Sequence, residues 1–110
     1  MIRHRTLLTA FVLALLLGDV QSAVPPLVDA ASRGDTDTVR TLLRQGADVN
    51  EAQGDGMTAL HWASEIGDAE LASVLLYAGI NLEAGTRIGN YTPLHVASRN
   101  GHAEVVGILI

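Results

Sequence analysis

"TPLHVASRNGHAEVVGILI", residues 92–110, repeats a stretch that occurs earlier in the chain, "TALHWASEIGDAELASVLL" at residues 58–76. The two stretches align without a gap at a separation of 34 positions. Self-similarity at a fixed period of this length is typical of repeat architectures. The identical pairs include Thr58 and Thr92, Leu60 and Leu94, His61 and His95, Ala63 and Ala97, Ser64 and Ser98, and Gly67 and Gly101.

A shift of 33 residues extends the match upstream. It pairs Ala63 with Ala30, Gly67 with Gly34, Leu75 with Leu42, Leu76 with Leu43 and Gly79 with Gly46. The chain is therefore predicted to contain three copies of one unit.

Local signals predict that each unit is a pair of short helices. Thr58 and Thr92 stand where a hydroxyl can accept from unpaired backbone N–H groups at a helix start. Pro93 occupies the first helical position, where a missing N–H is harmless, and Pro26 matches it in the first copy. The second helix of each later copy carries one apolar stripe, formed by Leu71, Val74 and Leu75 and by Val105, Ile108 and Leu109. Because a single stripe needs a neighbour to cover it, we expect the units to stack.

The chain resembles the ankyrin-repeat family on these residues. The family's T-P-L-H-x-A core stands as TALHWA at residues 58–63 and as TPLHVA at residues 92–97, and its G-A-D-V-N link stands at residues 46–50. The resemblance implies an all-α ankyrin-repeat solenoid of stacked helix-turn-helix units with projecting loops. It places the repeats at about residues 24–52, 53–86 and 87–110, the last of them incomplete.

Two departures from the pattern carry predictions. Asp29 stands where the later copies have Trp62 and Val96, and a polar residue there suits an N-terminal cap repeat. Trp62 itself is interpreted as a packing residue. The loop before the third copy is one residue longer than the loop before the second, with Asn90 in place of Gly56, which predicts a wider or mobile tip.

The first residues are predicted to be a secretory signal peptide. Arg3 and Arg5 precede an apolar run at residues 7–17, and small and polar residues follow at residues 18–23. The run is about half of the ~20 residues that cross a bilayer, so a permanent anchor is the weaker alternative. An ordinary core helix is also the weaker alternative, because the run has a charged start and no polar face. Residues 1–23 are expected to be removed by cleavage after Ser22 or Ala23, which predicts a secreted or periplasmic protein with no other membrane association.

The composition excludes several classes of protein. Without cysteine, the chain is neither a disulfide scaffold nor a lipid-acylated lipoprotein. Beyond residue 23 five arginines face eleven acidic residues and no lysine, which changes the formal charge from −5 to −6. This balance argues against nucleic acid as a partner and favours a basic or neutral one.

No residue pattern indicates catalysis or a cofactor, and the chain is not expected to be an enzyme. The acidic residues at helix starts are interpreted as favourable partners of the helix dipole; they are Asp35, Asp37, Asp68, Glu70 and Glu104. The histidines His61 and His95 are expected to bond to their own turns, as the resemblance implies, and no metal site is predicted. The alternative is a metal site that uses both of them. His102 is expected to be a surface residue at a helix start.

One modification motif in the sequence has two interpretations. The triplet Asn90-Tyr91-Thr92 is an N-glycosylation acceptor if the source is eukaryotic. The other interpretation is that Thr92 belongs to the repeat core and that Asn90 precedes it incidentally.

Resemblance to the family implies a protein-binding surface at the loop tips and at the exposed ends of the first helices. Met57, Ile88 and Tyr91 are the leading candidates, because exposed apolar and aromatic side chains often anchor a partner. In the second and third copies the candidates are Asp55, Met57, Glu65, Ile66, Ile88, Tyr91, Arg99 and Asn100.

The sequence thus predicts an exported, non-catalytic protein-interaction module that binds a protein partner. The alternative is the recognition segment of a longer protein with a catalytic or transport-associated domain beyond Ile110. The apolar ending at residues 108–110 leads us to expect a fragment of a longer repeat array.

Overall fold

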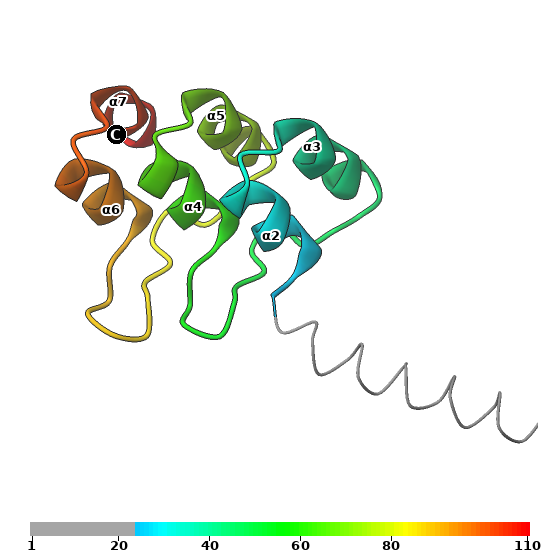
Figure 1. Ribbon diagram of the computed structural model, residues 1–110, viewed down its shortest axis with the longest axis horizontal. Coiled ribbons are helices and arrows are strands. Elements are labelled where there is room, and N and C mark those ends of the chain that lie inside the picture. Colours follow the sequence, from blue (N-terminus) through cyan, green and yellow to red (C-terminus); the bar gives the residue numbers. More distant parts are fainter. Residues whose placement is uncertain (1–23) are drawn as a thin grey trace, which may run out of the picture.

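The computed structural model describes residues 24–110, and the predicted signal peptide lies outside the described residues. Within residues 24–110 the chain forms six helices in three consecutive pairs (Figure 1). The helices are α2 (Pro26–Ser32), α3 (Thr36–Arg44), α4 (Ala59–Ile66), α5 (Ala69–Tyr77), α6 (Pro93–Arg99) and α7 (Ala103–Leu109).

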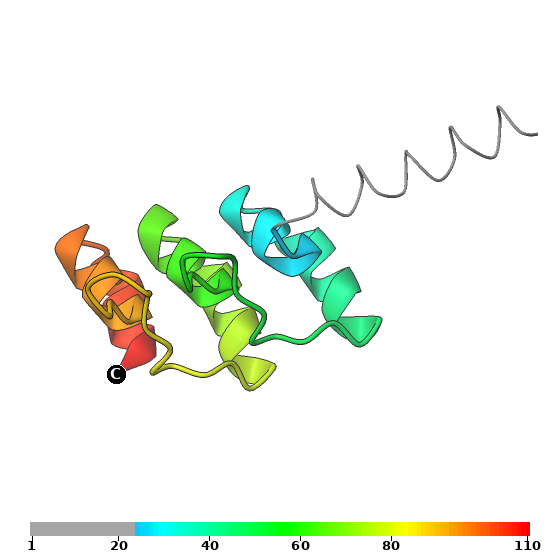
Figure 2. The same ribbon diagram turned by 90° about the horizontal axis from the view of Figure 1, so that it is seen from below.

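The pairs stack side by side in two layers. Helices α2, α4 and α6 form one row and α3, α5 and α7 form the other, while the loops before α4 and α6 project beyond the first row (Figures 1 and 2). Each helix contacts its partner in the same pair and the equivalent helix of the adjacent pair. The predicted all-α solenoid of stacked helix pairs is confirmed. None of the helices between residues 24 and 110 combines the length and the apolar character that crossing a bilayer would require.

Helix starts follow the residue types at each boundary. The Asp68 carboxylate accepts a hydrogen bond from the Leu71 N–H at 3.0 Å, and Asp35 accepts from Thr38 at 3.2 Å. These carboxylates satisfy backbone donors that the helix itself leaves unpaired. Helix α6 begins at Pro93 behind Thr92, whose Oγ1 accepts from the His95 N–H at 3.3 Å.

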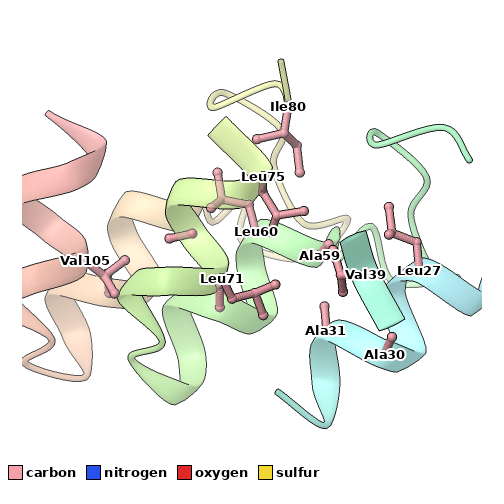
Figure 3. Close-up of a cluster of buried hydrophobic side chains, with 13 residues drawn as sticks. Leu27, Ala30, Ala31, Val39, Ala59, Leu60, Leu71, Leu75, Ile80 and Val105 are labelled. Atoms are coloured by element: carbon pink, nitrogen blue, oxygen red, sulfur yellow. The ribbon is translucent and has the colours of Figure 1, made fainter. Parts of the chain in front are cut away.

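The core runs through the stack between the two rows of helices (Figure 3). Leu60 and Leu71 of the middle pair are fully buried, as are Leu27 of α2 and Val105 of α7. Leu71, Leu75 and Val105 of the two predicted apolar stripes are thus covered by neighbouring helices, while Val74, Ile108 and Leu109 are only partly buried. Trp62 packs partly buried against this core, and its Nε1 donates to Gln53 Oε1 at 3.1 Å, which agrees with a packing role.

Asn90 has the same type of backbone conformation as Gly56, the equivalent residue of the preceding loop. Gly56 has a φ of +87° and Asn90 a φ of +51°, both in the left-handed region, which asparagine tolerates better than most residues. Hydrogen bonds cross the longer loop from Thr86 N–H to the Tyr91 carbonyl at 3.0 Å and from Tyr91 N–H to Thr86 Oγ1 at 3.0 Å. The extra residue is thus accommodated in a hydrogen-bonded turn.

Candidate protein-binding groove

A groove of about 740 Å³ lies between the second and third helix pairs, on the side of the first helices and the projecting loops. Helices α4 and α6 form one part of it, and the two loops form the other. Its volume falls within the range of sites that hold side chains or small ligands. The lining residues are Gly54, Asp55, Met57, Glu65, Thr86, Arg87, Ile88, Tyr91, Val96 and Arg99.

Large apolar side chains are exposed at this groove. Ile88 is 89% exposed at the tip of the second loop, and Tyr91 is 45% exposed where that loop returns to α6. Met57 contributes a half-buried thioether from the first loop. Apolar side chains that gather in one concave place mark a candidate interaction surface.

Arg99 and His95 contact the aromatic ring of Tyr91 in the groove. The Arg99 guanidinium carbon lies 5.4 Å from the centre of the Tyr91 ring, close enough for a cation–π interaction. Arg99 also lies 3.6 Å from a Glu65 carboxylate oxygen across the two helices. The His95 ring meets the Tyr91 ring edge-on, with the ring centres 6.4 Å apart. The two ring contacts, from Arg99 and His95, orient the Tyr91 ring beside α6.

The two loops are bonded to each other through Arg87. Its backbone N–H donates to the Asp55 carbonyl at 2.9 Å, and its Nη1 donates to the Gly54 carbonyl at 3.1 Å. Asp55 closes its own turn, because its carboxylate accepts from Met57 N–H at 3.0 Å and from Gln53 Nε2 at 3.2 Å. Backbone and side-chain hydrogen bonds therefore hold the two loops of the groove together.

The His61 ring makes hydrogen bonds on two sides, to the start of its own helix and to the loop that carries Tyr91. Its Nδ1 accepts from the Thr58 N–H at 3.0 Å, and its Nε2 lies 2.8 Å from the Tyr91 carbonyl oxygen. Because a carbonyl only accepts, the hydrogen-bond pattern assigns the neutral tautomer with its proton on Nε2. The fully buried imidazole thus ties the start of α4 to the loop that carries Tyr91.

The local role expected for the two histidines agrees with these hydrogen bonds. His95 repeats the turn contact, since Thr92 N–H donates to its Nδ1 at 3.0 Å. A metal site at His61 would need the Nδ1 lone pair that the backbone donor already uses. Within residues 24–110 no cluster of three His, Cys, Asp or Glu side chains is placed to hold a metal ion.

His61 should make the stability of the protein depend on pH. Burial lowers the pKa of the His61 imidazole below its usual value of 6.5, and the hydrogen bond to the Tyr91 carbonyl offsets part of this effect. Since the unfolded chain then binds the proton more readily, stability is complete above about pH 6.5 and falls as the pH drops from there toward the folded pKa. Urea unfolding at about pH 7.5 and about pH 5 should show this loss.

The matched variant for this prediction is His61→Gln, which removes the titrating group. Its free energy of unfolding should change much less over the same interval. Asp35 acts in a separate window, because hydrogen bonds from Thr38 lower the pKa of its carboxyl below 3.8. An equal loss of stability in both proteins would contradict the assignment to His61.

The structure brings most of the predicted binding residues together. The groove is lined by Asp55, Met57, Glu65, Ile88, Tyr91 and Arg99. It does not include Ile66 and Asn100. The Ile66 side chain lies over Gly34 of the first pair, and Asn100 Nδ2 donates to the Glu65 carbonyl at 3.4 Å.

Sequence reasoning missed four lining residues of the groove, Gly54, Thr86, Arg87 and Val96, and gave an incomplete account of His102. The His102 ring is half-buried against Gly67, and its Nε2 lies 3.0 Å from the Glu65 carbonyl. It does not cap α7 through its side chain. The available signal was the position itself, where the earlier copies carry the capping residues Asp35 and Asp68. A histidine there is long enough to reach the preceding pair.

Comparison with known proteins gives a consistent family match. A family model described as ankyrin repeats in three copies matches residues 27–110. The chain is 39% identical over 88 residues to the glycerophosphocholine phosphodiesterase gde1 of Schizosaccharomyces pombe, which covers 79% of this chain and 8% of that protein. It is 36% identical over 85 residues to the E3 ubiquitin-protein ligase XBAT33 of Arabidopsis thaliana, an alignment that covers 77% of this chain and 17% of that protein. It is 34% identical over 84 residues to the palmitoyltransferase Hip14 of Drosophila melanogaster, an alignment that covers 76% of this chain and 13% of that protein. The chain thus spans less than a fifth of the length of these relatives.

Proposed function

Because this chain belongs to the ankyrin-repeat family, whose repeats serve as protein-interaction modules, we propose that it binds a protein partner in the groove between its second and third repeats. The observation that carries the proposal is the exposure of Ile88 and Tyr91 in that groove. Both are large apolar side chains that would lose contact with water on binding.

The rigidity of the groove supports the proposal. Arg87 joins the two loops, and His61 and Arg99 hold Tyr91 from two sides. A surface that is already ordered loses little conformational entropy when a partner binds. Binding energy from the apolar contacts is therefore retained as affinity.

The state of the acidic side chains supports a non-catalytic role. Both carboxylate oxygens of Asp55 accept hydrogen bonds within its own turn, and Glu65 pairs with Arg99. A general base needs a carboxylate or imidazole that is free to reach a substrate proton. The carboxylates of the groove instead hold the structure of the loops and helices.

Export is the second part of the proposal. The charged, apolar and small-residue order of residues 1–23 supports a signal peptide and a secreted or periplasmic location. The alternative is that the groove serves a longer enzyme or a transport-associated protein. The phosphodiesterase, ligase and transferase names of the relatives, and the small share of them that the chain covers, support this alternative.

The natural protein would separate these possibilities by its N-terminus and its intact mass. Cleavage should give an N-terminus at Ala23 or Val24 and a mass below the 11.6 kDa of the 110 residues. An uncleaved N-terminus would contradict export. A mass far above that value would favour the longer protein.

The groove itself is tested by the double variant Tyr91→Ala, Met57→Ala. Partner capture by the purified protein should fall at least about tenfold, because truncated anchors of an interface typically cost this much or more. The control is Tyr77→Ala, since Tyr77 is 97% exposed on α5 and lies outside the groove. Equal capture by the double variant and the control would count against the proposed surface.

A further inference from the structure

We propose that the groove recognises an acidic peptide segment, in which an aspartate or glutamate stands next to a large apolar side chain. This inference rests on the proposed function and names the chemical class of its partner.

The acidic groups of the groove are already engaged. The Asp55 carboxylate accepts from Met57 N–H and from Gln53 Nε2, one bond to each oxygen. Glu65 faces the Arg99 guanidinium at 3.6 Å. A basic partner side chain would meet the like-charged Arg99 guanidinium at Glu65 and would share the Asp55 carboxylate with two hydrogen-bond donors of the protein.

Arg87 is in the opposite situation. Its Nη1 donates to the Gly54 carbonyl, and no acidic side chain within residues 24–110 lies within 4.0 Å of its guanidinium nitrogens. A guanidinium carries five N–H donors, so most of its donating capacity in the groove is unused. A carboxylate matches this fork with two parallel hydrogen bonds.

The apolar half of the recognition element lies beside this guanidinium. Ile88 follows Arg87 directly in the chain, and Met57 and Tyr91 line the same groove. A peptide that places its carboxylate on Arg87 therefore brings a neighbouring side chain against these three residues. A large aliphatic or aromatic residue would bury the most apolar surface there.

The acidic net charge of the chain leads to the opposite expectation, a basic or neutral partner. Charges on exposed surfaces are screened beyond about 8 Å at physiological ionic strength. The groove is formally balanced by two acidic and two basic side chains, Asp55, Glu65, Arg87 and Arg99. Local contacts therefore matter more than the net charge, and the free donors of Arg87 favour a carboxylate.

The experiment is a selection of random peptides of about 12 residues, displayed on phage, against the purified protein. Enriched peptides should contain an aspartate or glutamate within about two positions of a large apolar residue. For a synthetic enriched peptide, Arg87→Gln should raise the Kd at least about tenfold, as expected for the loss of a charge-assisted pair.

Matched variants isolate this contact. Arg44→Gln is the control on the protein side, because Arg44 also lacks an acidic partner within 4.0 Å in residues 24–110 but lies outside the groove on α3. Its Kd should equal that of the unchanged protein. Replacing the acidic residue of the peptide by its amide should weaken binding to the unchanged protein and leave binding to Arg87→Gln unaltered. Arg87→Lys keeps the charge but loses the fork, and should bind with intermediate affinity.

The outcomes separate the two proposals. Enriched peptides that are basic, or that bind Arg87→Gln as tightly as the unchanged protein, would overturn the acidic-segment inference and leave the binding function in place. Peptides that bind Tyr91→Ala without loss, or a selection that yields no binder, would overturn both.

Discussion

Gly67→Ala should lower the free energy of unfolding by more than about 2 kcal/mol, measured by urea unfolding followed by circular dichroism. The backbone of Gly67 has a φ of +76°, a conformation that costs other residues roughly 1–2 kcal/mol. A Cβ at this position would lie 2.5 Å from Nδ1 of the His102 ring, so the ring or the backbone would have to move. Overpacking of this kind adds about 1–3 kcal/mol.

Gly101→Ala provides the matched control. Gly101 has a φ of +72° at the equivalent turn of the third repeat, but a Cβ there would meet nothing within 4 Å. It should show only the backbone part of the loss, about 1–2 kcal/mol. In a His102→Ala background the excess of Gly67→Ala over Gly101→Ala should disappear. Equal effects of the two substitutions in the unchanged protein would contradict the packing of His102 on Gly67.

Leu60→Ala should cost about 2–5 kcal/mol, a large part of the roughly 5–15 kcal/mol that stabilises a small domain. Leu60 is fully buried on α4, which contacts both α2 and α6. The cavity therefore opens in the helix that packs on both neighbouring repeats. The Tm should fall by at least about 10 °C in a thermal melt.

The control is the same substitution at the equivalent position of the third repeat. Leu94 is only partly buried on α6, which contacts one neighbouring first helix within residues 24–110. Leu94→Ala should therefore be clearly milder than Leu60→Ala. A larger loss at Leu94 would mean that the middle repeat is not the main source of stability.

The order of the helices and their boundaries could be predicted because each repeat carries its own residues that begin and end helices. Asp68 and Thr92 lie at helix starts and bond to the backbone within three residues. Such contacts depend on sequence spacing alone, and the second copy confirms what the first suggests. The left-handed backbone at Asn90 was open to the same reasoning, since Gly56 marks the equivalent position.

The composition of the groove could be predicted only in part, because side-chain direction depends on the neighbouring repeat. Ile66 and Glu65 are adjacent at the end of α4, yet Glu65 lines the groove and Ile66 lies over Gly34. The Ile66 side chain packs in the space above that glycine, which has no side chain of its own. The spacing of residues within one repeat does not reveal this contact with the preceding repeat. Arg87 was missed for a related reason, since a long polar side chain on a loop has many directions and only the Gly54 carbonyl fixes this one.

The position of the groove between two repeats has a consequence for its behaviour. His61 reaches across this junction to the Tyr91 carbonyl, and Arg87 reaches across it to Gly54. The binding surface is complete only while the third repeat is docked on the second, so a bound segment stabilises the junction by mass action. Thermodynamic reciprocity then requires that any contact which strengthens the junction also tightens the hold on the partner.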